Sequence, residues 1–345
     1  MRIALLGPVA WRTPPRAYGP WEAVVSLLAE GLTARGVEVT LFATLDSVTS
    51  AKLDGVCARP YNEDPSIDGR VAEALHTAHC LARSHEFDLV HNHLDWLPLA
   101  MSRFCASPML TTIHGFGDPR ILPAYAHARS AFVSISDADR SPMLDYVATV
   151  HHGVEAAQWP ATAAAPGRGE DLVSFGRIHP DKATADAIEI ARRSGRRLTI
   201  CGPVQDEPYF REQVEPHIDG DRVRYLGNVG GAARATVLGG AAVLLHPLGF
   251  DEPFGLSVIE AMMCGTPVVT YRRGAMPEVV DDGRTGFVVD SIDAAVAAVP
   301  GALALDRSNV AAIARRRFSA DRMVDAYLSV YYQLLQRPHV NSPAP

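Results

Sequence analysis

The sequence predicts an α/β protein with two doubly wound parallel sheets. Short apolar runs rich in β-branched residues alternate with amphipathic helical patterns along the chain. This alternation is typical of parallel sheets covered by helices on both faces. It is interrupted at residues 160–170, which are rich in Pro, Gly and Ala. The chain has 345 residues, more than the ~250–300 at which one hydrophobic core stops growing, so we expect two domains.

We expect domains at residues 1–155 and 156–318, joined by a linker at 160–170. A helix at 319–337, with Ser319 as its N-cap, is expected to cross back to the first domain. Helical patterns also cover residues 22–35 and 70–85. Ten apolar runs are predicted as strands, and they begin at Arg2, Val37, Phe87, Pro108, Ala131, Asp171, Arg196, Arg222, Ala241 and Pro267.

The composition excludes several classes of function. A net charge of -7 attracts neither nucleic acid nor anionic lipid, so an anionic ligand needs a local basic site. No stretch reaches the ~20 apolar residues of a membrane span, and we therefore expect a cytoplasmic protein without membrane association. The five cysteines are odd in number and lack the spacing of a zinc site or disulfide framework: Cys57, Cys80, Cys105, Cys201 and Cys264.

The stretch LLHPLGFDEPFGLSVIEAMMCGTPV contains a predicted strand that ends at His246 and a helix that begins near Phe254 or Gly255. A helix start offers unpaired N–H groups and a partial positive charge, which together bind anions. Gly255 lets a phosphate or a sugar approach the backbone. Glu252 and Glu260 can accept hydrogen bonds from sugar hydroxyls. Taken alone, two glutamates at this spacing also fit solvated residues beside an amphipathic helix.

This stretch resembles the signature E-P-F-G-L-x-x-x-E-A-x-x-x-G-x-P-V of the retaining glycosyltransferases of family four, beginning at Glu252. That family has the GT-B architecture, in which two Rossmann-like domains face a deep cleft. The resemblance implies that Glu252 contacts the donor sugar and that the backbone of Phe254, Gly255 and Leu256 cradles sugar and phosphate. It also implies that Glu260 holds the ribose hydroxyls.

The stretch VSFGRIHPDKATADAIEIA carries two cations after a predicted strand that ends at Gly176. Arg177 and Lys182 suit a diphosphate that leaves as an anion, and the resemblance implies that they bind it. Ala183 stands where the family usually has glycine. The alternative interpretation is a pair of exposed cations at a helix start.

The segment PPRAYGPWEAVV resembles the opening loop of the family, in which consecutive glycines bring N–H groups to the donor phosphate. Gly19 matches the first glycine. Pro20 replaces the second and has no N–H to donate. We expect the following helix to start at Glu22.

Histidines follow two predicted strands of the first half, in FDLVHNHLDW and TTIHGFGD. The resemblance places His114 beside the donor sugar. We expect structural roles for His91 and His93. Alternate residues of a strand point the same way, which also permits a metal site, but no third ligand has a suitable spacing.

Asp137 and Asp139 form a D-x-D pattern, which other transferases use to hold a metal. We instead interpret Ser136 and Asp137 as the N-cap of a helix. No metal ligand is therefore assigned.

Later matches to the family place Gly274 and Glu278 in a loop near the donor and Gly286 in a turn. Gly202 and Asn228 are expected beside the nucleotide base. The candidate acceptor loops are residues 11–16 and 116–122.

The expected function is a retaining, metal-independent transfer of a hexose from a nucleoside-diphosphate sugar to an acceptor hydroxyl. The resemblance assigns catalytic roles to Arg177, Lys182, Glu252 and His114. UDP-glucose is the expected donor, the acceptor is a small molecule or a glycan, and no cofactor is expected. The protein is expected to be a monomer or a homodimer.

Four alternatives stay open from the sequence. They are a GDP-mannose-type transferase of polysaccharide or glycolipid assembly, a sugar-nucleotide epimerase or phosphorylase-like enzyme on the same fold, a nucleotide-sugar-binding module without activity, and a dinucleotide oxidoreductase. The last is disfavoured because no G-x-G-x-x-G follows the first predicted strand.

Overall fold

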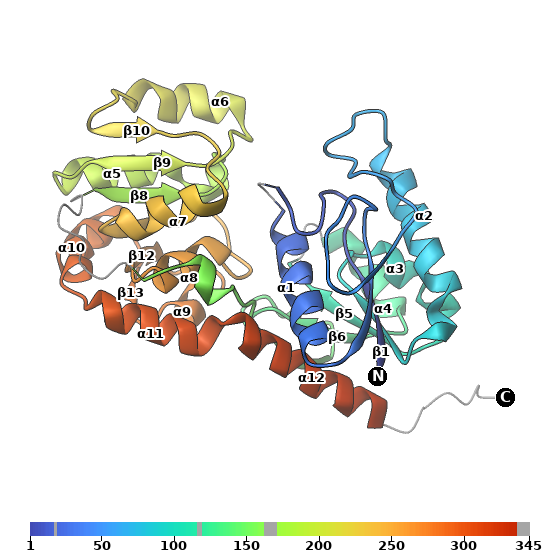
Figure 1. Ribbon diagram of the computed structural model, residues 1–345. Coiled ribbons are helices and arrows are strands. Elements are labelled where there is room, and N and C mark those ends of the chain that lie inside the picture. Colours follow the sequence, from blue (N-terminus) through green and yellow to red (C-terminus); the bar gives the residue numbers. More distant parts are fainter. Residues whose placement is uncertain (17–18, 116–118, 162–170, 337–345) are drawn as a thin grey trace. The chain divides into compact units, whose positions relative to one another are not determined.

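The computed structural model describes residues 1–16, 19–115, 119–161 and 171–336. The chain divides into two compact units, each built from alternating strands and helices (Figure 1). The first unit comprises Met1–Ile135, Asp139–Gly153 and Ala320–Pro345, and the second comprises Ser136–Ala138 and Val154–Ser319. Most of the expected linker and part of the second candidate acceptor loop lie outside the described residues.

The first unit contains a seven-stranded sheet in the order β3-β2-β1-β4-β5-β6-β7, with every pair of neighbours parallel. The order reverses direction between β1 and β4, which makes this pair of strands the topological switch point of the sheet. The strands are β1 (Arg2–Leu6), β2 (Glu38–Phe42), β3 (Lys52–Asp54), β4 (Leu89–Asn92), β5 (Met109–Ile113), β6 (Ala131–Ser134) and β7 (Tyr146–Thr149).

The C-terminal helix belongs to the first unit, where it packs against the first helix of the chain. The first helix buries an apolar face that includes Val24, Val25, Leu28 and Leu32. It begins at Pro20 rather than at Glu22, because a proline at the first helical position loses no hydrogen bond. The helices of this unit are α1 (Pro20–Ala34), α2 (Gly69–Ala82), α3 (Leu97–Ala100), α4 (Leu122–His127) and α12 (Ala320–Gln336).

The second unit contains a six-stranded parallel sheet in the order β10-β9-β8-β11-β12-β13. Its switch point lies between β8 and β11. The strands are β8 (Leu172–Phe175), β9 (Leu198–Cys201), β10 (Val223–Tyr225), β11 (Val243–His246), β12 (Val268–Tyr271) and β13 (Gly286–Val289).

The helices of the second unit cover both faces of its sheet (Figure 1). α5 and α10 pack together on one face, and α7 and α8 pack together on the other, where α8 also contacts α11. The helices are α5 (Thr184–Arg193), α6 (Glu207–Tyr209), α7 (Gly231–Gly240), α8 (Leu256–Met263), α9 (Met276–Val279), α10 (Ile292–Leu303) and α11 (Arg307–Phe318).

The ten predicted strands are all present, and the two-domain α/β fold is confirmed. Three further strands, β3, β7 and β13, were missed because none is a fully buried apolar run. The prediction of a turn at Gly286 is wrong, since this residue opens β13 and pairs with Val268. No described helix is both long enough and apolar enough to cross a membrane.

The expected helix start at Ser136 and Asp137 is also wrong, because no helix follows β6. The backbone N–H groups of Asp137 and Ala138 donate instead to the carboxylate of Glu278. The Ser136 hydroxyl donates to the Pro253 carbonyl at 2.7 Å. These contacts join residues 136–138 to the second unit.

Candidate active site

The loops after β8 and β11 carry most of the predicted site residues. These two strands are neighbours, with Leu172 opposite Val243, and they flank the switch point of the second sheet. Because they are parallel, both loops leave the same edge of the sheet. Ligands bind at this edge in open α/β sheets. The fold therefore brings the cations after β8 and the acidic loop after β11 to one place.

The Lys182 ammonium contacts the Glu252 carboxylate. The Nε2 atom of His246, the last residue of β11, lies 3.7 Å from the same carboxylate. Burial alone would raise the pKa of Glu252, but His246 and the charge of Lys182 outweigh it and lower the pKa to about 2. Glu252 is therefore an ionised carboxylate held against a partly buried cation.

Arg177 and Lys182 both lie against the ring of Phe250. The Arg177 guanidinium carbon is 5.9 Å from the ring centroid and the Lys182 ammonium nitrogen is 4.8 Å from it. Arg177 also donates hydrogen bonds to Gln205 at 2.8 Å and to Asp181 at 3.1 Å. The aromatic ring holds two cations near each other, where a diphosphate would neutralise both.

Helix α8 begins at the end of the same loop. Its N-cap is Gly255, whose φ of 94° is left-handed, and no described side chain caps the first turn. A Cβ atom at Gly255 would lie 2.7 Å from the Met276 methyl group. Phe254 is buried, with its ring 6.0 Å from that of Phe318, so its side chain belongs to the core. The first backbone N–H groups of α8, which starts at Leu256, thus remain available to an anion.

Glu260 lies farther along α8 and forms an ion pair with Arg234 of α7. Burial raises the pKa of Glu260 despite this neighbouring cation. The Arg234 guanidinium lies over Phe175 at 4.5 Å and over Trp159 at 5.9 Å. Arg234 was not among the residues predicted for the site. Its position as a single cation in the first turn of the glycine- and alanine-rich α7 was the one sequence feature that could have indicated it.

Gly176, Gly202 and Asn228 follow the neighbouring strands β8, β9 and β10 at the same edge of the sheet. The φ of Gly202 is 143°, and a Cβ atom there would lie 1.7 Å from the Gly176 carbonyl oxygen. Only glycine fits this close approach of two backbones. The Tyr225 hydroxyl donates to the Gly202 carbonyl at 2.7 Å, and Asn228 is exposed.

His114 and Gly19 belong to the other unit, unlike the remaining predicted site residues. His114 follows β5 and is hydrogen-bonded through both ring nitrogens to other histidines, His93 at 3.0 Å and His152 at 3.3 Å. Trp21 of α1 stacks on its ring at 5.1 Å. Burial lowers the pKa of His114 well below its usual value, so the ring is neutral. His152 was missed because one histidine at a strand end carries no signal by itself.

Gly19 is the N-cap of α1, and the Glu22 carboxyl group occupies this helix start. A Glu22 oxygen accepts a hydrogen bond from the Trp11 backbone N–H at 3.1 Å. Burial raises the pKa of Glu22 to about 7. The loop that the family uses for phosphate thus has a carboxyl group here, and Pro20 removes one of its N–H donors.

The described part of the chain contains no group of three or more His, Cys, Asp or Glu side chains arranged to hold a metal ion. His91, His93 and His114 are hydrogen-bonded ring to ring rather than directed at a common point. Asp139 is partly buried, and this burial raises its pKa to about 7.

Comparison with known proteins defines the class. Residues 156–317 match the model described as "Glycosyl transferases group 1", and residues 22–157 match "Glycosyltransferase Family 4". Sucrose-phosphate synthase from Thermosynechococcus elongatus has a similar structure, with a TM-score of 0.80 at 19% identity over 98% of this chain and 100% of that one. The molecule is a glycosyltransferase with the GT-B fold.

Curated relatives agree with this class. The chain is 28% identical to glycogen synthase of Mycobacterium tuberculosis, over 93% of this chain and 89% of the relative. It is 30% identical to D-inositol 3-phosphate glycosyltransferase of Streptomyces scabiei, over 78% of this chain and 74% of the relative. The chain belongs to the group 1 glycosyltransferases, and the prediction of a transferase enzyme is confirmed.

Proposed function

We propose that this enzyme binds a nucleoside-diphosphate hexose on its second unit and transfers the hexose to an acceptor hydroxyl with retention of configuration. The observation that carries the proposal is the contact of Lys182 with Glu252 beside Arg177 and the start of α8. This arrangement offers two cations and free N–H groups to a diphosphate. It offers a carboxylate to the sugar hydroxyls.

Binding of the donor would replace the ion-pair partners of Lys182, Glu252 and Glu260 by groups of the donor. The diphosphate takes the Lys182 ammonium, while sugar hydroxyls donate to Glu252 in its place. In the same way the ribose hydroxyls donate to Glu260, which Arg234 neutralises in the free protein. Each carboxylate therefore has hydrogen-bond donors before and after binding, so neither is left without a polar partner.

The reaction follows from the placement of positive charge. The acceptor oxygen attacks the anomeric carbon on the face from which the diphosphate leaves, and the bond between that carbon and the phosphate oxygen breaks. The electron pair goes to the phosphate oxygen, which also takes the acceptor proton. Arg177, Lys182 and the start of α8 stabilise the developing charge, which is the task that a divalent metal performs in other transferases. We therefore propose a reaction without a metal.

UDP-glucose is the proposed donor, and a small molecule or glycan is the proposed acceptor. Glycogen synthase and D-inositol 3-phosphate glycosyltransferase are among the relatives, and their names point to a glycan and a phosphorylated polyol as the acceptors of those proteins. The helix start that includes Gly19 carries a carboxyl group, which favours an uncharged acceptor over an anionic one.

The test measures thermal shifts with UDP, GDP, ADP and dTDP in a metal chelator, followed by product analysis with the selected sugar nucleotide. A ligand at about 100 times its Kd stabilises the folded state by about 2.7 kcal/mol, enough to rank the bases. A new α-linked glycoside from an α-linked donor supports the proposal. An inverted product, an epimerised sugar, or strict dependence on a divalent metal contradicts it.

A further inference from the structure

Four buried histidines of the first unit are hydrogen-bonded in series. His152 Nε2 pairs with His114 Nδ1 at 3.3 Å, and His114 Nε2 pairs with His93 Nδ1 at 3.0 Å. His93 Nε2 then pairs with His91 Nδ1 at 3.3 Å. Every link joins the Nε2 of one ring to the Nδ1 of the next, so the chain has a direction.

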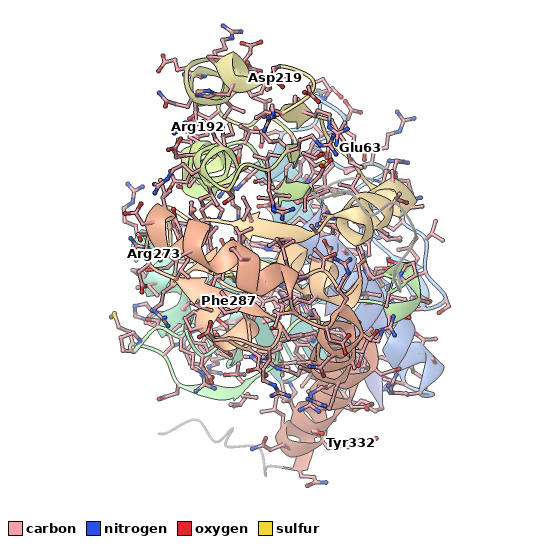
Figure 2. The ribbon with its side chains drawn as sticks, turned by 90° about the vertical axis from the view of Figure 1, so that its left-hand side faces the viewer. Glu63, Arg192, Asp219, Arg273, Phe287 and Tyr332 are labelled. Atoms are coloured by element: carbon pink, nitrogen blue, oxygen red, sulfur yellow. The ribbon has the colours of Figure 1, made fainter. Side chains whose placement is uncertain are left out.

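The series ends on helix α12. The Tyr331 hydroxyl pairs with His91 Nδ1 at 2.6 Å. His91 Nε2 pairs with the Thr112 hydroxyl at 2.8 Å, and Thr112 in turn pairs with the Tyr327 hydroxyl at 2.8 Å. Tyr327 and Tyr331 are fully buried, whereas the side chain of the next residue, Tyr332, is exposed (Figure 2).

The tautomers of the four histidine rings depend on one another. Burial lowers the pKa of each ring far below its usual value, so all four are neutral. A neutral imidazole carries one N–H and one lone pair, and each link between two nitrogens needs one of each. The protons therefore lie either on Nε2 in all four rings or on Nδ1 in all four.

The hydroxyl groups distinguish the two arrangements. With the protons on Nε2, both tyrosines donate. The His91 Nδ1 lone pair then accepts from Tyr331 as well as from His93, and the Thr112 oxygen accepts from His91 and Tyr327. With the protons on Nδ1, Tyr331 must accept from His91. Each arrangement leaves one hydroxyl hydrogen without an acceptor among the described residues, that of Thr112 in the first and that of Tyr331 in the second. A phenol is more acidic than an alcohol and is the stronger donor, so the first arrangement is favoured.

We propose that Tyr331 is a positioning residue that sets the tautomer of His114 through His91 and His93. Its hydroxyl donates to His91 and thereby holds the proton of His114 on Nε2. Without this hydroxyl, the Nδ1 arrangement leaves no hydroxyl hydrogen unpaired, because Tyr327 donates to Thr112 and Thr112 donates to His91. The C-terminal helix thus controls a ring at the end of a strand far away in the sequence.

The test observes the histidine rings of the full-length protein by long-range ¹H–¹⁵N NMR, with the His114 signals assigned from their loss in His114→Gln. We expect the wild-type protein to carry the His114 proton on Nε2 and Tyr331→Phe to carry it on Nδ1. Tyr327→Phe removes the other buried hydroxyl, and Tyr332→Phe removes an exposed one. Both controls keep the wild-type tautomer.

A wild-type His114 protonated on Nδ1 overturns the proposal by itself, whether or not Tyr331→Phe folds. An unchanged tautomer in folded Tyr331→Phe, or the same change in Tyr327→Phe, also overturns it. The location of His114 beside the donor rests on the proposed function. The control of its tautomer by Tyr331 does not. If the tautomer changes while kcat and KM for the donor stay the same, the tautomer control stands and the role of His114 beside the donor fails.

Discussion

The ammonium of Lys182, just after β8, contacts the carboxylate of Glu252, just after β11. The two residues lie 70 positions apart in the sequence. Parallel pairing of β8 with β11 brings them to one edge of the sheet. The pair joins the proposed diphosphate site to the proposed sugar site, and the first two predictions depend on it.

Lys182→Ala should lower kcat by about 10²–10³, because removal of one preorganised charge at a developing oxyanion has this cost. The measurement is turnover of the sugar nucleotide under saturation, with circular dichroism to check folding. Arg192→Ala is the matched control, since Arg192 is an exposed cation of α5 paired with Glu189. Turnover of Lys182→Ala within a few-fold of wild type would remove Lys182 from the mechanism.

Glu252→Gln should weaken binding of the sugar nucleotide about tenfold or more but leave binding of the free nucleoside diphosphate equal or tighter. The amide is a weaker acceptor for sugar hydroxyls than the carboxylate, and the diphosphate no longer competes with a carboxylate for Lys182. Titration calorimetry with both ligands measures the two effects. Equal weakening of both ligands would show that Glu252 does not act on the sugar.

Glu22→Gln should change the free energy of unfolding more favourably at pH 8 than at pH 4.5, in each case relative to wild type at the same pH. The pKa of Glu22 is about 7 in the folded protein against 4.5 for the free side chain. The folded state therefore binds the extra proton between these values, and wild type loses stability as the pH rises through 7. The glutamine side chain of the variant cannot ionise, so the difference between variant and wild type should grow by roughly 3 kcal/mol.

Urea unfolding at both pH values measures this difference. Groups that titrate in both proteins, including Asp139 and the buried histidines, cancel in the comparison. Glu38→Gln is the control, because Glu38 is exposed. A Glu22→Gln effect that is the same at pH 4.5 and pH 8 would mean that folding does not raise the pKa of Glu22.

Ala183→Gly should raise the free energy of unfolding by about 0.5–1 kcal/mol. Ala183 has φ 44° and ψ 47°, and it is the only residue other than glycine with positive φ in the described part of the chain. A left-handed conformation costs an L-residue about 1–2 kcal/mol, and glycine returns part of the gain through the entropy of the unfolded chain. Urea unfolding checks the change, and a destabilised variant would contradict it.

The sequence by itself determined the two parallel sheets, because buried parallel strands require continuous apolar runs that are visible without coordinates. It also located the loops that carry Arg177, Lys182, Glu252 and Gly255, since each follows such a run directly. The candidate site residues in these loops were predicted from local pattern and from resemblance. Strands β3, β7 and β13 were not predicted because they are partly exposed.

Only the tertiary structure decided which polar side chains are paired. Arg234 meets Glu260, and Tyr331 meets His91 across 240 residues. It also showed that Glu278 takes the N–H groups of Asp137 and Ala138, where a helix had been predicted. Such contacts depend on distances between side chains that are far apart in the sequence, and no local pattern of residues encodes those distances.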